Sequence, residues 1–191
     1  MVISFVTPTY LSPLDLTVLG GSDKRGNPNM IGQFSTGFKY AIALCLRNNI
    51  TMTIIVKKDG IKTEYTINSK TLNCDSTNKS KKVIVINEYN VSTHTNKEYV
   101  TGYSIDLGFD WNLDKVFTEL YSNMLDESGQ YYEEYISVID EGTYIYLEFD
   151  DNSEFTDIVI NKDNYVLNNS YKLFTLSSTI DIIDNPCNFL I

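Results

Sequence analysis

The sequence has few of the residues from which common metal and catalytic centres are built. It contains three cysteines that lie far apart, it has no Cys-x-x-Cys pair, and His94 is its only histidine. Zinc sites and histidine-dependent catalytic triads are therefore poorly supported. An odd number of unclustered cysteines is typical of a reducing compartment, so we expect a cytoplasmic protein.

Positive charge is also scarce. Fifteen Lys and Arg residues against twenty-five Asp and Glu residues give a net charge of −10. A protein that binds nucleic acid along its backbone needs a broad basic surface, so we expect no nucleic-acid partner. The sequence has no apolar run as long as a membrane span, and its first residues lack the pattern of a signal peptide, so we expect no membrane partner. A small basic pocket for one nucleotide is compatible with this charge.

The apolar content suffices for one hydrophobic core. The chain has 191 residues, of which 42% are hydrophobic and 13% aromatic, as in a globular protein. This length is too short for two ordinary domains, and the sequence shows no internal repeat and no Pro- or Ser-rich linker. We therefore expect a single domain over residues 1–191.

The pattern of apolar residues predicts an α+β fold. Two helices are expected, at 38–47 and 112–125. Runs rich in Ile, Val, Thr and Tyr predict strands. These are 50–57, 62–67, 82–88, 100–107 and the C-terminal strands of 135–191, namely 135–139, 143–149, 156–160 and 171–183. Hairpin turns are expected at Asp59-Gly60 and Glu141-Gly142, and a polar connection at 71–80. The sum predicts a mixed or antiparallel sheet with helices on one face.

The predicted helix at 112–125 carries two separate stripes of side chains. One is apolar and suits docking on a sheet: Leu113, Phe117, Leu120 and Met124. The other is polar: Glu119, Asn123 and Asp126. A carboxylate and a carboxamide one turn apart offer the oxygen ligands that Mg²⁺ prefers, so the polar stripe is a candidate cation site. The simpler alternative is a polar helix face that meets only water.

A glycine-containing segment at the start of the first predicted helix is the best candidate for a phosphate site. It reads Gly32-Gln33-Phe34-Ser35-Thr36-Gly37-Phe38-Lys39. Glycine allows backbone N–H groups to approach a ligand closely, and the N-terminus of a helix attracts anions. Lys39 and Lys24 add positive charge nearby. The alternative is an ordinary loop-to-helix junction, since two glycines are a weak signal.

Together the two segments resemble the Bergerat-fold nucleotide-binding domain of the GHKL ATPase superfamily. The N-box helix of that superfamily carries a Glu, an Asn four residues later and often an Asp three further on, as the helix near 112–127 does here. Its lid and glycine motif are matched by residues 19–39, which begin Leu19-Gly20-Gly21-Ser22-Asp23-Lys24. The two motifs occur in reversed order, as in a circular permutation. This order is similar to that of a group of uncharacterised bacteriophage proteins with ATP-binding motifs.

The resemblance implies a phage protein of the host cytoplasm that binds ATP with Mg²⁺ and hydrolyses it slowly, in some relatives as a homodimer. Asn123 would then hold Mg²⁺, and Glu119 would orient the attacking water. Backbone N–H groups of 32–38 would hold the phosphates, with Lys39 or Lys24 balancing their charge. The adenine amino group would donate to a carboxylate, either Asp126 or Asp151.

Two departures from the superfamily pattern support a different hypothesis. Ser35 stands in place of the middle glycine, and the nearest counterpart of the Asp-x-Gly box is Asp151-Asn152-Ser153. They favour a degenerate, non-catalytic Bergerat fold that serves as a virion component or inhibits a host factor through an unidentified protein partner. The presence of Glu119, Asn123, Asp126 and Lys39 together favours nucleotide binding.

Overall fold

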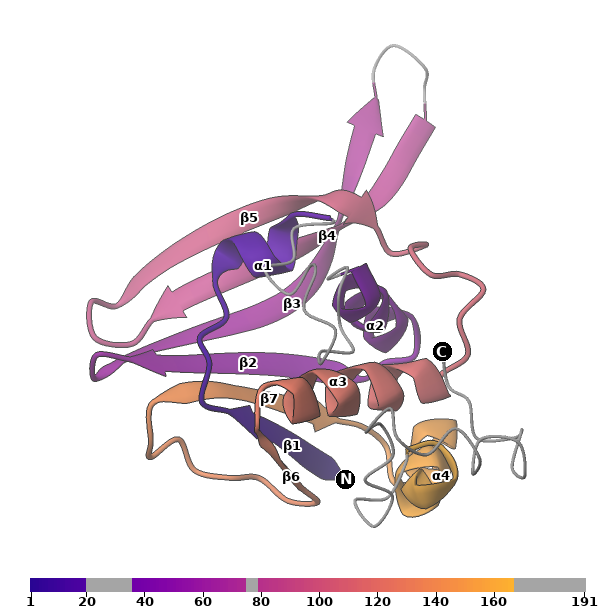
Figure 1. Ribbon diagram of the computed structural model, residues 1–191. Helices are drawn as coiled ribbons and strands as arrows, with labels where there is room; N and C mark the ends of the chain where they lie inside the picture. Colours follow the sequence, from indigo (N-terminus) through magenta and orange to yellow (C-terminus); the bar gives the residue numbers. More distant parts are fainter. Residues whose placement is uncertain (20–35, 75–78, 167–191) are drawn as a thin grey trace, which may run out of the picture.

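The fold is built on one seven-stranded antiparallel sheet, with strand order β5-β4-β3-β2-β7-β1-β6 (Figure 1). The computed structural model describes residues 1–19, 36–74 and 79–166. In chain order its elements are β1 (Val2–Thr7), α1 (Pro13–Thr17), α2 (Thr36–Arg47), β2 (Thr51–Lys58), β3 (Ile61–Cys74), β4 (Lys79–Asn90), β5 (Thr95–Ser104), α3 (Asp114–Asp126), β6 (Gln130–Tyr132), β7 (Gly142–Glu148), α4 (Glu154–Ile160) and a 3₁₀ turn, η1 (Lys162–Asn164). The predicted α+β class is confirmed.

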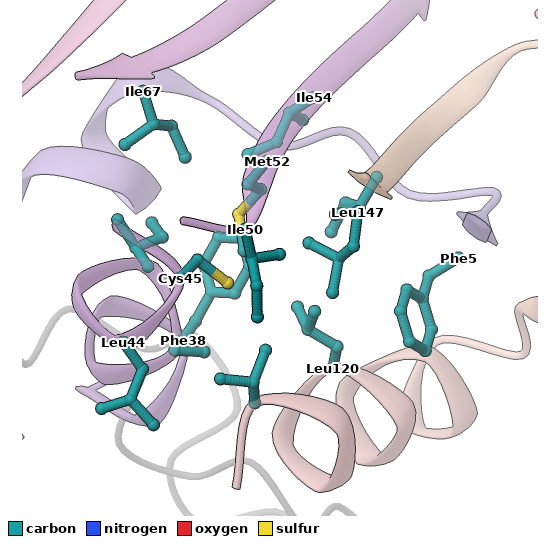
Figure 2. Packing of buried hydrophobic residues seen from close by; sticks show 14 of the residues in the cluster. Phe5, Phe38, Leu44, Cys45, Ile50, Met52, Ile54, Ile67, Leu120 and Leu147 are labelled. Atoms are coloured by element: carbon teal, nitrogen blue, oxygen red, sulfur yellow. The ribbon is translucent and has the colours of Figure 1, made fainter. Parts of the chain in front are cut away.

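The main core lies between the sheet and the helices α1, α2 and α3, which cover one of its faces (Figure 1). Both predicted helices are present, because their apolar residues recur at helical spacing and face the sheet. Figure 2 shows Phe38 of α2 and Leu120 of α3 in the same apolar cluster as Ile54 of β2. None of the helices in the described part of the chain is long and apolar enough to cross a membrane.

The hairpin expected at Asp59-Gly60 is confirmed between β2 and β3. Both residues have positive φ, 52° and 75°, as a two-residue type I′ turn requires. Beyond it, β3 and β4 continue into the stretch 71–80 that was expected to be a polar connection, of which 75–78 lie outside the described residues. The expectation was wrong because these polar residues pair with one another in a two-stranded ribbon that projects from the sheet (Figure 1).

Residues 135–139 do not form the predicted strand, and Glu141-Gly142 is not a hairpin turn. The stretch crosses the face of the sheet opposite the helices, where Ile136 and Val138 pack on a small cluster formed by Ile55, Tyr144 and Tyr146. The alternation of apolar and polar residues in 135–139 does reflect burial of one side of the segment. It arises because one side of an extended segment rests flat on the sheet, not because the segment pairs with a strand.

Two further predictions concern the C-terminal part of the chain. Residues 156–160, expected as a strand, belong to the helix α4, whose N-cap Ser153 accepts a hydrogen bond from the backbone N–H of Thr156. The β-branched residues of this stretch suggested a strand, but Ser153 is a helix-start signal and Phe155 and Val159 share a buried helical face. The strand predicted at 171–183 lies outside the described residues.

Tyrosine hydroxyls hold the 133–141 segment on the sheet. The Tyr146 hydroxyl donates to the carbonyl of Ile136 at 2.7 Å, and its ring stacks on that of Tyr135 with centroids 4.6 Å apart. We expect Tyr146→Phe to lower the free energy of unfolding by ~1 kcal/mol, because the Ile136 carbonyl loses its donor. Urea unfolding measures this. Tyr132→Phe is the matched control, since the Tyr132 hydroxyl bonds only locally, to Gln130; an equal loss in both variants would contradict the prediction.

Buried tyrosines also make the fold sensitive to alkali. Burial raises the pKa of Tyr65 to about 12 from 10.0, and it raises the pKa values of Tyr103 and Tyr146 as well. Between pH 10 and these higher values the unfolded chain loses protons that the folded chain keeps, so stability falls as the pH rises. We expect the urea midpoint to be lower at pH 11 than at pH 9, and tyrosinate absorbance to appear at higher pH in the folded protein than in the unfolded one. Tyrosinate that forms at pH 10 in a fully folded protein would contradict this.

Candidate functional site

The N-terminus of α2 and the middle of α3 meet on the helix-covered face of the sheet, although about eighty residues separate them in the sequence. At this junction Gly37, the second residue of α2, lies against the carboxylate of Glu119. A Cβ atom at position 37 would overlap that carboxylate. Only glycine leaves room for this contact, which places a carboxylate where the exposed N–H groups and dipole of α2 favour negative charge.

Lys39 lies one turn into α2 and is buried, with only 1% of its surface exposed. Desolvation lowers the pKa of its ammonium group, and the carboxylates of Asp15 and Glu119 act in the opposite direction. A buried lysine is expected to be held by such carboxylates, since an uncompensated charge in the interior is costly. Lys39 therefore connects all three helices of this face: Asp15 belongs to α1 and Glu119 to α3.

Asp15 was not recognised as a site residue from the sequence. It closes a capping box at the start of α1, where its carboxylate accepts hydrogen bonds from the Ser12 backbone N–H at 2.8 Å and the Ser12 hydroxyl at 2.7 Å. The signal Ser12-Pro13-Leu14-Asp15 indicates a helix start, with proline at its first position. Nothing in that signal reveals that the capping carboxylate also faces a lysine twenty-four residues later.

Asn123 lies one helical turn after Glu119 and is bonded to it. Its side-chain nitrogen Nδ2 donates to Glu119 Oε1 at 2.8 Å. This arrangement leaves the amide oxygen as the group that can bind a cation. Among the described residues there is no group of three or more His, Cys, Asp or Glu side chains placed to hold a metal ion. Mg²⁺ at Asn123 would therefore take most of its ligands from bound phosphate and water, as Mg²⁺ does in many nucleotide sites.

The two candidates for adenine recognition lie in different places. Asp126 ends α3 and is partly buried, about 10 Å along the helix from Glu119. Asp151 lies in the turn between β7 and α4, where its carboxylate pairs with the N-terminal ammonium group of Met1 and its side chain is 76% exposed. Binding of a base by Asp151 would require this ion pair to open.

The remaining predicted site residues fall at the edge of the described chain or beyond it. Thr36 is the first residue of α2 and is partly buried. Lys24 and the glycine-motif residues Gly32, Gln33, Phe34 and Ser35 lie outside the described residues. The structure thus brings together Gly37, Lys39, Glu119 and Asn123, which come from both predicted motifs.

Comparison of the chain with protein-family models, with curated protein sequences and with solved structures found no match. The relationship to the GHKL superfamily therefore stays a prediction that rests on the motif residues themselves. What the structure adds is independent of that relationship: Glu119 of the polar stripe lies against Gly37 at the N-terminus of α2, and Asn123 is bonded to Glu119.

The contact between Gly37 and Glu119 can be tested by coupling two substitutions. In a Glu119→Ala background, Gly37→Ala should stabilise the protein by up to ~1 kcal/mol, because alanine is the better helix former. In the wild-type background the new methyl group must displace the Glu119 carboxylate, so the gain should be absent or reversed. Urea unfolding of the four proteins of this cycle measures the difference. The same effect of Gly37→Ala in both backgrounds would show that the two residues are not in contact.

Proposed function

We propose that this protein binds a magnesium–nucleotide complex, with ATP as the expected ligand, between the N-terminus of α2 and the polar face of α3. The observation that carries the proposal is the approach of Glu119 to Gly37 beside a buried lysine. A helix N-terminus, a carboxylate and a carboxamide oxygen at one point are the groups needed to hold phosphate, to orient water and to bind a cation.

A cation is required by the charges at this point. The carboxylate of Glu119 already lies against the N-terminus of α2, so a phosphate arriving there meets a negative charge. Mg²⁺ bound through the Asn123 amide oxygen would stand between the two and remove the repulsion. We therefore expect nucleotide binding to depend strongly on Mg²⁺, and free phosphate without Mg²⁺ to bind poorly.

Because Lys39 is buried, its ammonium group would not contact the phosphate directly. Its buried ammonium group interacts with the carboxylates of Asp15, which is exposed, and Glu119, which is partly buried, so it acts on the nucleotide through Glu119. Its positive charge helps to hold the carboxylate of Glu119 in place, as a group that orients or deprotonates water requires. Lys39 is thus a positioning residue, and Glu119 is the candidate catalytic residue for slow hydrolysis of ATP to ADP and phosphate.

A second candidate function is a non-catalytic scaffold, in which the protein acts through a protein partner. The interactions of Lys39 with carboxylates of α1 and α3 favour it, because they link all three helices without any ligand. The two functions differ in what Asn123 does. A scaffold needs only its hydrogen bond to Glu119, whereas a nucleotide site needs its amide oxygen as well.

Calorimetric titration with ATP, ADP and a non-hydrolysable analogue, with and without Mg²⁺, tests the proposal. We expect Mg²⁺-dependent binding that Asn123→Ala weakens at least ~10-fold, which corresponds to about 1.4 kcal/mol. Glu119→Gln should bind the nucleotide but lose phosphate release. Asn112→Ala, which changes an exposed asparagine just before α3, is the matched control and should bind as the wild type does. Absence of binding at millimolar nucleotide would overturn the proposal in favour of the scaffold.

A further inference from the structure

The strand β6 leaves one edge of the sheet open among the described residues. It has three residues, and its pairing partner is β1, with Phe5 opposite Tyr131. The outer edge of such a strand presents backbone N–H and C=O groups that can pair with another extended segment. Proteins normally keep edge strands short or cover them with another segment. The outer edge of β6 is therefore a place where another segment can pair.

A cavity of about 340 Å³ lies beside this edge, between β6 and the end of α3. Its lining is mainly aromatic and aliphatic: Tyr121, Met124, Leu125, Gly129, Gln130, Tyr131 and Tyr132. Leu125 is 38% exposed there. The hydroxyl of Tyr131 is buried and has no hydrogen-bond partner, which is unusual for a buried polar atom. A cavity lined mainly by aromatic and aliphatic residues suits an apolar side chain, and the Tyr131 hydroxyl beside this lining still needs an acceptor.

The chain passes close to this cavity just before the described residues end. Lys162 of η1 forms an ion pair with Glu133 at 2.6 Å, and Glu133 directly follows β6. Tyr121 is also close enough to act on the Lys162 ammonium group. Tyr165 and Val166 then pack against the main core. The described part of the chain therefore ends near β6, and five extended residues after Val166 would span ~16 Å.

The sequence that follows has the pattern of a strand with one apolar side. Within 174–182, every second residue is apolar except Ser178: Phe174, Leu176, Ile180 and Ile182. The residues between them are polar, Thr175, Ser177, Thr179 and Asp181, and the apolar Leu173 and Ile183 flank this stretch on the polar side. Such alternation is typical of a strand that covers a core on one side and meets solvent on the other.

We propose that residues 171–183 pair with the outer edge of β6 as an additional strand of the same molecule. Their apolar side chains would fill the cavity against Tyr121 and Leu125, and the Tyr131 hydroxyl would donate to a backbone carbonyl of the added strand. Their polar side chains would lie on the side of Gln130 and Tyr132. This proposal is independent of nucleotide binding.

Hydrogen exchange of the full-length chain, followed by mass spectrometry, tests it. We expect amides of 171–183 and of β6 to exchange at least ~10-fold more slowly than unstructured chain. Phe174→Asp with Ile180→Asp should abolish this protection in both segments. Thr175→Asp with Thr179→Asp adds the same charge on the polar side and should leave it intact. Fast exchange of 171–183 in the wild type, or equal effects of the two double variants, would overturn the proposal.

Disulfide trapping gives a second measurement that does not depend on destabilising variants. With Cys74 and Cys187 changed to Ser, Gln130→Cys is combined in turn with Cys at positions 175, 177 and 179. At least one combination should form an intramolecular disulfide faster than its counterpart with Asn96→Cys, an exposed position on β5 at the opposite edge of the sheet. Disulfides that form only between molecules would assign the edge to a second copy and overturn the proposal, as would equal rates at the two edges.

Discussion

The packing of α2 against α3 on one face of the sheet is the contact on which the core and the candidate site both depend. Phe38 and Leu120 contribute to the core beneath these helices, and the same approach presses Glu119 against Gly37. A protein interior is close-packed, so a shift of α3 that relieved the contact at Gly37 would also disturb the core below it. The site is therefore held by rigid elements, as precise positioning of a carboxylate requires.

The face of the sheet away from the helices is also covered, by the 133–141 segment, so the central strands are buried on both faces. Along β7 every residue from Gly142 to Leu147 is buried. Alternate side chains enter the helix-covered core or the cluster under the 133–141 segment, where Tyr144 and Tyr146 bond to backbone carbonyls of that segment. The outer strands lack this cover, and β3 and β4 continue beyond the sheet as an exposed ribbon. Stability is thus concentrated around β2, β7 and β1, beneath the site.

Sequence patterns predicted elements well where one physical rule dominates. The stripe of Leu113, Phe117, Leu120 and Met124 has helical spacing, and all four side chains are buried in the structure. Residues 135–139 were mistaken for a strand because alternation reports only that one side is covered, not whether the backbone pairs. The helix α4 was missed because its β-branched residues outweighed the cap at Ser153. The first error concerns tertiary context, to which local patterns are blind, whereas the second gave a local propensity more weight than a local cap.

The site was predictable to a similar degree. Glu119, Asn123 and Gly37 were identified as parts of two motifs, and a resemblance to a known family was needed to join them. Asp15 was missed, because its local signal describes a helix cap and a cap carries no information about distant partners. The burial of Lys39 was also unexpected, since a lysine near a helix start normally extends into solvent.

Buried Lys39 bears on the choice between a site and a scaffold. A buried charge is a poor way to join helices, since an apolar residue of similar volume usually stabilises a core as well or better. A fold that needed only tight packing would gain by replacing the buried Lys39 with such a residue. The charges make sense if one carboxylate must stay ionised next to a helix N-terminus while a ligand binds. In the proposed site Glu119 would be that carboxylate, and the buried Lys39 would supply the compensating charge from the side away from solvent.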